Sequence, residues 1–216
     1  MNKYDTIIFD MDGTILDTLE DLQDAVNYAL EKLGMPKRTL EEIRQFVGNG
    51  VRRLMELSVP DGLENPRFEE AFLLFKEYYG EHCNDKTKVY DGIMELMHDL
   101  KEEGYALAIV SNKLDSAVKD LNEKYFGKYV HVAIGDCEGM ARKPAPDTVF
   151  AALRELGKTA ETAVYIGDSE VDLATAKNSG LPCISVLWGF RDKAFLEEQG
   201  GTQFAKTPEE VKQFLK

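Results

Sequence analysis

Short apolar runs recur along the chain and predict the buried strands of a parallel sheet. In the first run, Tyr4–Asp10, the residues Ile7, Ile8 and Phe9 form a continuous apolar stretch that ends in acidic residues and glycine. Runs of this kind are typical of strands that are covered on both faces. Amphipathic stretches of about one helix separate the later runs, which are Tyr105–Val110, Val130–Ile134, Ala163–Ile166 and Cys183–Leu187. This alternation predicts an α/β fold with a Rossmann-like parallel sheet at its core.

The segment from residue 17 to about residue 83 interrupts this alternation, because its pattern predicts helices and no strand. Apolar residues recur there at helical spacing from Leu22 to Leu33. Thr39, followed three residues later by Glu42, is a capping-box signature for a second helix. Two further helices follow, the first of them from Gly50. The segment is therefore predicted to be all-helical.

The helical segment divides the predicted sheet into two parts of the chain. It follows the first strand directly, and the chain returns to the sheet at Asp85–Val89. We predict a core domain formed by residues 1–15 and 87–216, and an inserted all-helical cap, or lid, formed by residues 16–86. An inserted block of this kind is the form that many active-site lids take.

The composition narrows the range of partners. The 216 residues include 26 Lys and Arg against 39 Asp and Glu, a formal net charge of −13. Binding to nucleic acid or to an anionic membrane depends on clustered cations, so both are disfavoured as partners. The three cysteines show no CxxC spacing, which favours reduced thiols in a cytoplasm. We expect a cytoplasmic protein, a monomer or weak homodimer, that acts on a small molecule.

Polar residues follow several of the predicted strands, and they are candidates for a site. The carboxyl ends of parallel strands form the edge of a sheet at which ligands bind. Asp10 and Asp12 follow the first strand with Gly13 next, and two such carboxylates in one pocket push their pKa values apart. The remaining candidates at strand ends and loops are Ser111, Asn112, Lys143, Asp168 and Asp172.

These residue types are suited to phosphate chemistry. Asp10, Asp168 and Asp172, together with a backbone carbonyl, would form an oxygen-only site suited to Mg²⁺. Ser111 offers a hydroxyl donor and Lys143 a fixed positive charge, which a phosphoryl group requires.

Four motifs resemble those of the haloacid dehalogenase superfamily, and the similarity spans nearly the whole chain. They are DMDGT, the strand-end Ser111, Lys143 within KPAPD, and GDSEVD. The resemblance implies that Asp10 is a nucleophile forming an aspartyl phosphate and that Asp12 is the general acid and base. It implies that Ser111 and Lys143 hold the phosphoryl group. The Mg²⁺ ligands are then expected from Asp10, Asp12, Asp168 and Asp172, and Gly13, Thr14 and Asn112 are assigned to substrate binding.

The predicted cap contains one segment suited to an anion. Gly48, Asn49 and Gly50 precede a helix whose first turn carries Arg52, and a helix N-terminus with exposed backbone N–H groups attracts negative charge. The segment also resembles the glycine-rich lid segment of phosphoglycolate phosphatases. Phosphoglycolate is therefore the leading substrate hypothesis, with a plain loop followed by surface arginines as the alternative.

Three functions remain open at this point. The helical insertion resembles the lid of the subfamily that includes phosphoglycolate phosphatase and β-phosphoglucomutase. The leading hypothesis is a Mg²⁺-dependent phosphatase acting on a small phosphate monoester, because Asp12 suits protonation of an alcohol leaving group. A sugar phosphomutase of the β-phosphoglucomutase type needs the same carboxylates. A catalytically silent binding domain is the third.

Overall fold

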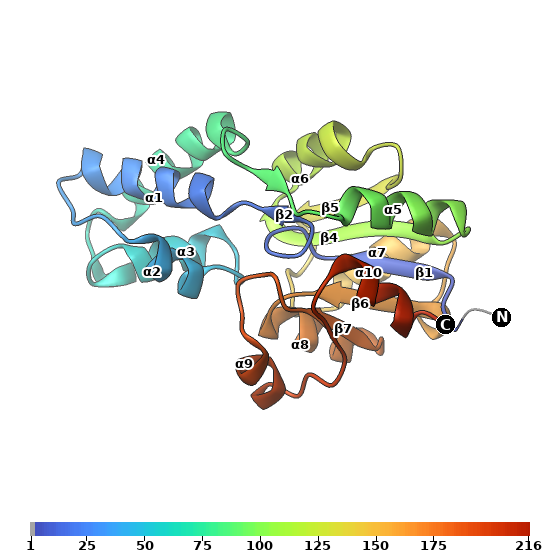
Figure 1. Ribbon diagram of the computed structural model, residues 1–216. Coiled ribbons are helices and arrows are strands. Elements are labelled where there is room, and N and C mark those ends of the chain that lie inside the picture. The colour runs from blue at the N-terminus through green and yellow to red at the C-terminus, as the bar shows by residue number, and fades with distance from the viewer. Residues whose placement is uncertain (1–2) are drawn as a thin grey trace. The chain divides into compact units, whose positions relative to one another are not determined.

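The computed structural model describes residues 3–216, which form two compact units (Figure 1). One unit holds the described residues up to Leu16 together with Val89–Lys216, and the other is Asp17–Lys88. The predicted domain boundaries lie within two residues of these. No helix among the described residues has the length and apolar composition that a membrane span requires.

A six-stranded parallel sheet forms the centre of the first unit. Its strand order is β5-β4-β1-β6-β7-β8, and every neighbouring pair is parallel. The four residues of β1 are buried, as their uninterrupted apolar pattern predicts. The strands are β1 (Thr6–Phe9), β4 (Ala106–Leu114), β5 (Val132–Asp136), β6 (Ala163–Gly167), β7 (Cys183–Val186) and β8 (Phe204–Ala205).

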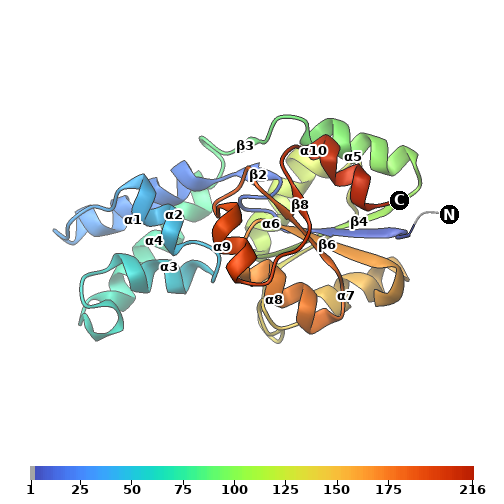
Figure 2. The same cartoon turned by 60° about the horizontal axis from the view of Figure 1, so that its bottom comes forward.

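Helices cover both faces of this sheet (Figures 1 and 2). On one face, apolar side chains of α5 (Ile93–Glu102), α6 (Asp115–Leu121) and α10 (Pro208–Val211) pack against the strands. On the other face, α7 (Asp147–Leu156) and α8 (Glu170–Ser179) do so. Residues 193–198 form the short helix α9. The predicted α/β fold with a parallel sheet is confirmed.

The second unit contains only helices apart from its ends. They are α1 (Leu19–Lys32), α2 (Leu40–Phe46), α3 (Val51–Ser58), a 3-10 turn at Gly62–Glu64 and α4 (Phe68–His82). The capping box at the start of α2 is present, because the Glu42 N–H donates to the Thr39 hydroxyl and the Thr39 N–H donates to the Glu42 carboxylate. Within the unit, Phe75 stacks on Tyr79 and both are buried.

Several predicted element ends were wrong. The second predicted strand does not end at Val110, because β4 continues to Leu114 through a register shift against β5. The capping residues Thr207 and Pro208 predict a final helix that runs to Lys216, but α10 ends at Val211 and a 3-10 turn follows it. Three two-residue strands, β8, β2 (Leu16–Asp17) and β3 (Lys88–Val89), were not predicted. Pairing of two residues leaves no periodic signal in a sequence.

Candidate active site

Asp10 lies at the carboxyl end of the central strand β1. Its backbone N–H donates to the Ile166 carbonyl at 2.9 Å, which continues the ladder between β1 and β6. The Met11 N–H donates to Oδ1 of Asp10 at 2.7 Å and fixes the carboxylate from the other side. The side chain is 11% exposed. Asp10 is therefore a rigidly held, nearly buried carboxylate at the edge where parallel sheets bind ligands.

Two further carboxylates from the end of β6 and the start of α8 join Asp10. Asp10, Asp168 and Asp172 each offer an oxygen, and these oxygens lie within 4.8 Å of one another. Asp168 accepts hydrogen bonds from the Phe190 N–H at 2.7 Å and the Thr14 hydroxyl at 3.3 Å. Asp10 thus forms one acidic cluster with two aspartates that follow it in the sequence by more than 150 residues.

Asp172 has a structural role in addition to its place in the cluster. Its Oδ2 accepts from the Ser169 hydroxyl at 2.7 Å and from the backbone N–H groups of Asp168 and Ser169 at 3.2 and 3.1 Å. The bond from the Ser169 N–H is one half of the capping box of α8. The same carboxylate therefore caps the helix and fixes the loop that carries Asp168.

Lys143 brings a positive charge to the cluster from the loop before α7. Its Nζ lies 2.8 Å from Oδ1 of Asp10 and 2.8 Å from Oδ1 of Asp172, and it donates to the Tyr165 hydroxyl at 2.9 Å. The side chain is 1% exposed. An ammonium removed from water in this way is stable only with such partners.

The electrostatics of the cluster show an excess of negative charge. Burial, followed by the charge of Asp172, raises the pKa of Asp10 well above its usual value. The same two causes raise the pKa of Asp168 to about 7. Burial opposes ionisation of Lys143 as well, but Asp10 and Asp172 raise its pKa well above the usual value. Three carboxylates thus share one buried ammonium.

A divalent cation fits this arrangement of charges and atoms. The three carboxylates supply oxygen ligands only, which is the set that Mg²⁺ prefers, and a divalent ion would offset the excess negative charge. The residues that could hold it are Asp10, Asp168 and Asp172, as predicted from the sequence. Asp12 was also predicted as a ligand, but its side chain is outside this group of the described residues.

Asp12 has a different electrostatic environment from Asp10. Its Oδ1 lies 2.9 Å from the ammonium of Lys113, and its side chain is 21% exposed. The predicted effect of Asp12 on the pKa of Asp10 stays a prediction, and the carboxylates that contribute most to raising the pKa of Asp10 are Asp172 and Asp168. Lys113 was not predicted as a site residue. Its position directly after Ser111 and Asn112 was the available signal.

The predicted phosphate-binding residues lie around the cluster and also contact protein atoms. Ser111 is buried, and its hydroxyl accepts from the Lys113 N–H at 3.2 Å. The Asn112 side-chain amide donates to the Lys143 carbonyl at 3.0 Å and so ties the Lys143 loop to β4. Gly13 has φ +84°, and a Cβ there would lie 2.4 Å from Oδ2 of Asp168, so only glycine fits. Their contacts with phosphate stay a prediction.

A loop after β7 completes the surroundings of Asp168 and was missed in the sequence. Trp188 Nε1 donates to the Thr14 carbonyl at 2.9 Å, which joins this loop to the one after β1. A Cβ on Gly189 would lie 2.4 Å from the Gly13 carbonyl oxygen and from Cβ of Asp168. The loop follows a predicted strand, and that position was the signal for it.

The glycine-rich segment of the helical unit has the predicted backbone but a different arginine environment. Gly48 and Gly50 have φ of +117° and +81°, and α3 begins at Val51. The Arg52 guanidinium forms a two-pronged ion pair with Glu69. It also lies 5.1 and 5.3 Å from the ring centroids of Phe68 and Phe72. This arrangement favours the structural alternative for Arg52.

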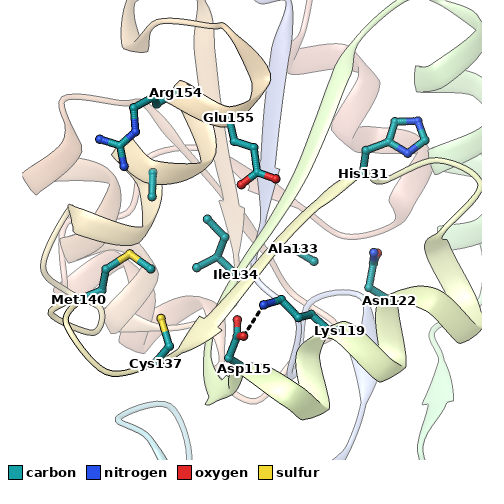
Figure 3. Close-up of a pocket in the computed structure, with 11 residues that line it drawn as sticks. Asp115, Lys119, Asn122, His131, Ala133, Ile134, Cys137, Met140, Arg154 and Glu155 are labelled. Atoms are coloured by element: carbon teal, nitrogen blue, oxygen red, sulfur yellow. Dashed lines mark hydrogen bonds and ion pairs between the residues drawn. The ribbon is translucent and has the colours of Figure 1, made fainter.

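A separate hollow of about 490 Å³ lies at the edge of the sheet beside β5 (Figure 3). Side chains of α6, β5 and α7 line it, and the Asp115–Lys119 ion pair lies on one side. None of the predicted site residues is among those that line it. The acidic cluster and this hollow are therefore separate features of the unit that contains the sheet.

The chain is similar to proteins of a known family. The sequence profile of haloacid dehalogenase-like hydrolases matches residues 7–186, and the chain belongs to this family. It is 31% identical to phosphoglycolate phosphatase 1 of Pseudomonas aeruginosa over 91% of this chain and 74% of that one. It is 32% identical to the phosphoglycolate phosphatase of Aquifex aeolicus over 85% of each chain.

A solved structure agrees with these relatives. A Lactobacillus delbrueckii subsp. bulgaricus protein, provisionally named a phosphoglycolate phosphatase, superposes with a TM-score of 0.94 and 38% identity over 99% of this chain and 98% of that one. The predicted membership of the haloacid dehalogenase superfamily, with resemblance to phosphoglycolate phosphatases, is confirmed.

Proposed function

We propose that this protein is a Mg²⁺-dependent phosphatase that hydrolyses a small phosphate monoester through an aspartyl phosphate on Asp10. The observation that carries the proposal is the placement of Lys143 between Asp10 and Asp172 beside Asp168. It combines a nucleophile, a buried cation and a divalent-ion site within one constellation. Phosphoryl transfer depends mainly on such positioning and charge stabilisation.

The reaction has two steps on this chain. A carboxylate oxygen of Asp10 forms a bond to phosphorus while the bond from phosphorus to the substrate alcohol breaks, and Asp12 gives its proton to the departing oxygen. Water then attacks the aspartyl phosphate, Asp12 takes a proton from that water, and phosphate leaves. The partial exposure of the Asp12 side chain suits a group that gives and takes protons during the reaction.

The phosphoryl group is held by residues around the nucleophile. The Ser111 hydroxyl and the Lys143 ammonium are the donors for its oxygens, and Tyr165 and Asp172 keep the ammonium in place. Asp10, Asp168 and Asp172 would hold Mg²⁺, which would supply positive charge to neutralise the phosphate oxygens. The raised pKa values of Asp10 and Asp168 support this assignment, because they mark a site that lacks positive charge.

Phosphoglycolate is the leading substrate within this proposal. The support is the name of the relatives from Pseudomonas aeruginosa and Aquifex aeolicus, with which the chain shares about a third of its residues over most of its length. The ion pair of Arg52 with Glu69 favours a structural role for this side chain, and a contact between Arg52 and the substrate carboxylate stays a prediction.

A panel of phosphate monoesters tests the proposal. We expect the purified chain with Mg²⁺ to release phosphate from phosphoglycolate faster than from sugar phosphates or glycerol phosphate, and chelation to stop the reaction. Isomerisation of a sugar phosphate without release of phosphate would identify a mutase instead. Absence of turnover on every ester would contradict a catalytic role.

A further inference from the structure

The buried ammonium of Lys113 has no part in the reaction steps above. Its Nζ lies 2.9 Å from Oδ1 of Asp12, and its side chain is 1% exposed whereas that of Asp12 is 21% exposed. A lysine that is removed from water in this way depends on its charged partner. The two aspartates of the DMDGT motif thus have separate lysines: Lys143 contacts Asp10, and Lys113 contacts Asp12.

The backbone of Lys113 is fixed from two directions. The Lys113 N–H donates to the Ser111 hydroxyl at 3.2 Å within the irregular end of β4, where the register against β5 shifts. The Lys113 carbonyl oxygen would lie 2.7 Å from a Cβ on Gly135, so β5 approaches it as closely as a glycine allows. The Lys113 side chain therefore extends from a rigid segment, and its ammonium can hold the Asp12 carboxylate in one orientation.

We propose that Lys113 is a positioning residue for proton transfer by Asp12, an inference that rests on the proposed function. The ammonium holds Oδ1 of Asp12 and leaves the second carboxyl oxygen for the proton that the leaving group receives. Without Lys113, the partly exposed Asp12 side chain would sample several rotamers, and only some of them reach the departing oxygen.

The dependence of rate on the leaving group tests this role. An alkoxide leaves only with a proton, whereas a nitrophenolate leaves without one. The quantity to compare is kcat/KM, because it reports the steps up to transfer of the phosphoryl group to Asp10. We expect Lys113→Met to lower kcat/KM for phosphoglycolate by about 10- to 100-fold, part of the 10²- to 10⁴-fold that general acid catalysis contributes. For 4-nitrophenyl phosphate we expect a decrease of about threefold at most, since that step needs no acid.

A double mutant separates positioning from other effects. Asp12→Asn should show the same preference for the aryl ester, and adding Lys113→Met to it should cause no further loss on phosphoglycolate. Such non-additivity is expected when one residue acts through the other. Lys113→Arg keeps a cation at this place and should recover part of the lost rate.

Lys119→Met is the matched control, because it removes a neighbouring lysine ion pair, with Asp115 on α6, that is outside the acidic cluster. It should leave both substrates unaffected. Thermal melts of each variant verify folding. If Lys113→Met does not fold, Lys113→Gln takes its place, since its amide is uncharged and can still occupy the space.

The outcomes distinguish this inference from the proposed function. A wild-type chain without phosphatase activity, or Asp12→Asn without a leaving-group preference, would refute the proposed function and the inference together. A leaving-group preference in Asp12→Asn but equal losses, or none, on both esters in the folded Lys113 variant would overturn the inference alone. A preference in both variants that does not add in the double mutant supports it.

Discussion

Asp10 and Asp12 are two residues apart, yet their surroundings differ in a way that suits their proposed roles. Asp10 is nearly buried beside Lys143 and two other carboxylates, which suits a nucleophile that must approach a charged phosphate next to a metal ion. Asp12 is partly exposed and paired with Lys113, which suits a group that exchanges protons. The difference comes from side chains of β4 and of the loop before α7.

Replacing Asp10 by asparagine should abolish turnover and leave the fold intact. The amide keeps the shape of the side chain but cannot form an aspartyl phosphate. Because the substitution removes one of three crowded carboxylates, the thermal midpoint without divalent ions should not fall below that of the wild type. Phosphate release and thermal melts measure the two effects. Residual activity near the wild-type level would refute the nucleophile assignment.

Tyr165→Phe tests the hydrogen bond that the Tyr165 hydroxyl accepts from Lys143. The Tyr165 hydroxyl is fully buried, accepts from Lys143 and donates to Oδ1 of Asp172 at 3.2 Å. Its removal should lower the free energy of unfolding by about 1 to 3 kcal/mol, the usual cost of unpaired buried groups. We also expect kcat to fall, since Lys143 loses one of its contacts. Urea unfolding and steady-state kinetics check both.

Tyr4→Phe is the control for that substitution. The Tyr4 hydroxyl is also buried, but it has no hydrogen-bond partner in the part of the chain that the structure describes. Its removal should therefore leave kcat unchanged and should not destabilise the protein. Equal losses in both variants would mean that the Tyr165 hydroxyl contributes only volume.

At the scale of elements, the site forms where several strands end together. The loops after β1, β6 and β7 supply Asp10, Asp168 and the Trp188–Phe190 segment, as the rule for parallel sheets predicts, and the last part of β4 supplies Ser111. The strands of this sheet were predictable because long buried runs leave a clear signal. The continuation of β4 beyond Val110 was not, since polar residues there are buried by neighbouring loops.

The carboxylate of Asp115 links the start of α6 to the edge strand β5. Asp115 accepts from the Gly135 N–H at 2.9 Å and pairs with Lys119. Partial burial acts to raise the pKa of Asp115, but the hydrogen bonds from Lys119 and Gly135 together lower it below its usual value. A lowered pKa means that this carboxylate stabilises the fold above its unfolded pKa and loses that effect as pH falls through the folded pKa.

Asp115→Ala should therefore destabilise the protein in a pH-dependent way. We expect a loss of about 1 kcal/mol in the free energy of unfolding at pH 7, the typical size for one hydrogen-bonded group. The difference from the wild type should shrink as pH falls below about 4, where the unfolded carboxyl is protonated. Urea unfolding at several pH values measures it. A difference that is constant with pH would contradict the role of the charge.

At the scale of the whole molecule, a net charge of −13 and the buried acidic cluster predict that divalent ions stabilise the folded protein. The cluster belongs entirely to the unit that contains the sheet. An ion that binds the folded state and not the unfolded chain shifts the unfolding equilibrium by mass action. The site should therefore be detectable without substrate.

Mg²⁺ should stabilise the wild type by about 2.7 kcal/mol at 100 times its dissociation constant. Denaturant unfolding with Mg²⁺, compared with NaCl at equal ionic strength, separates site binding from screening of the net charge. Asp168→Asn removes one ligand and should lose most of this stabilisation while keeping the response to NaCl. If Mg²⁺ stabilised the wild type and Asp168→Asn equally, the ion would act at the protein surface and not at the acidic cluster.

The sequence by itself determined the α/β class, the helical insertion and most of the site. These features rest on local periodicity and on strand ends, which neighbouring residues decide. Asp10, Lys143, Asp168 and Asp172 were identified in this way and lie together in the structure.

Only the tertiary structure decided which charged groups are partners. The bond from Lys113 to Asp12 spans 101 residues, and that from Trp188 to Thr14 spans 174. The expected partner of Arg52 was a bound anion, whereas its partner in the structure is Glu69. The strength of a charge pair depends on distance and burial, and neither is a property of one segment. Folding therefore decides which carboxylate each lysine contacts.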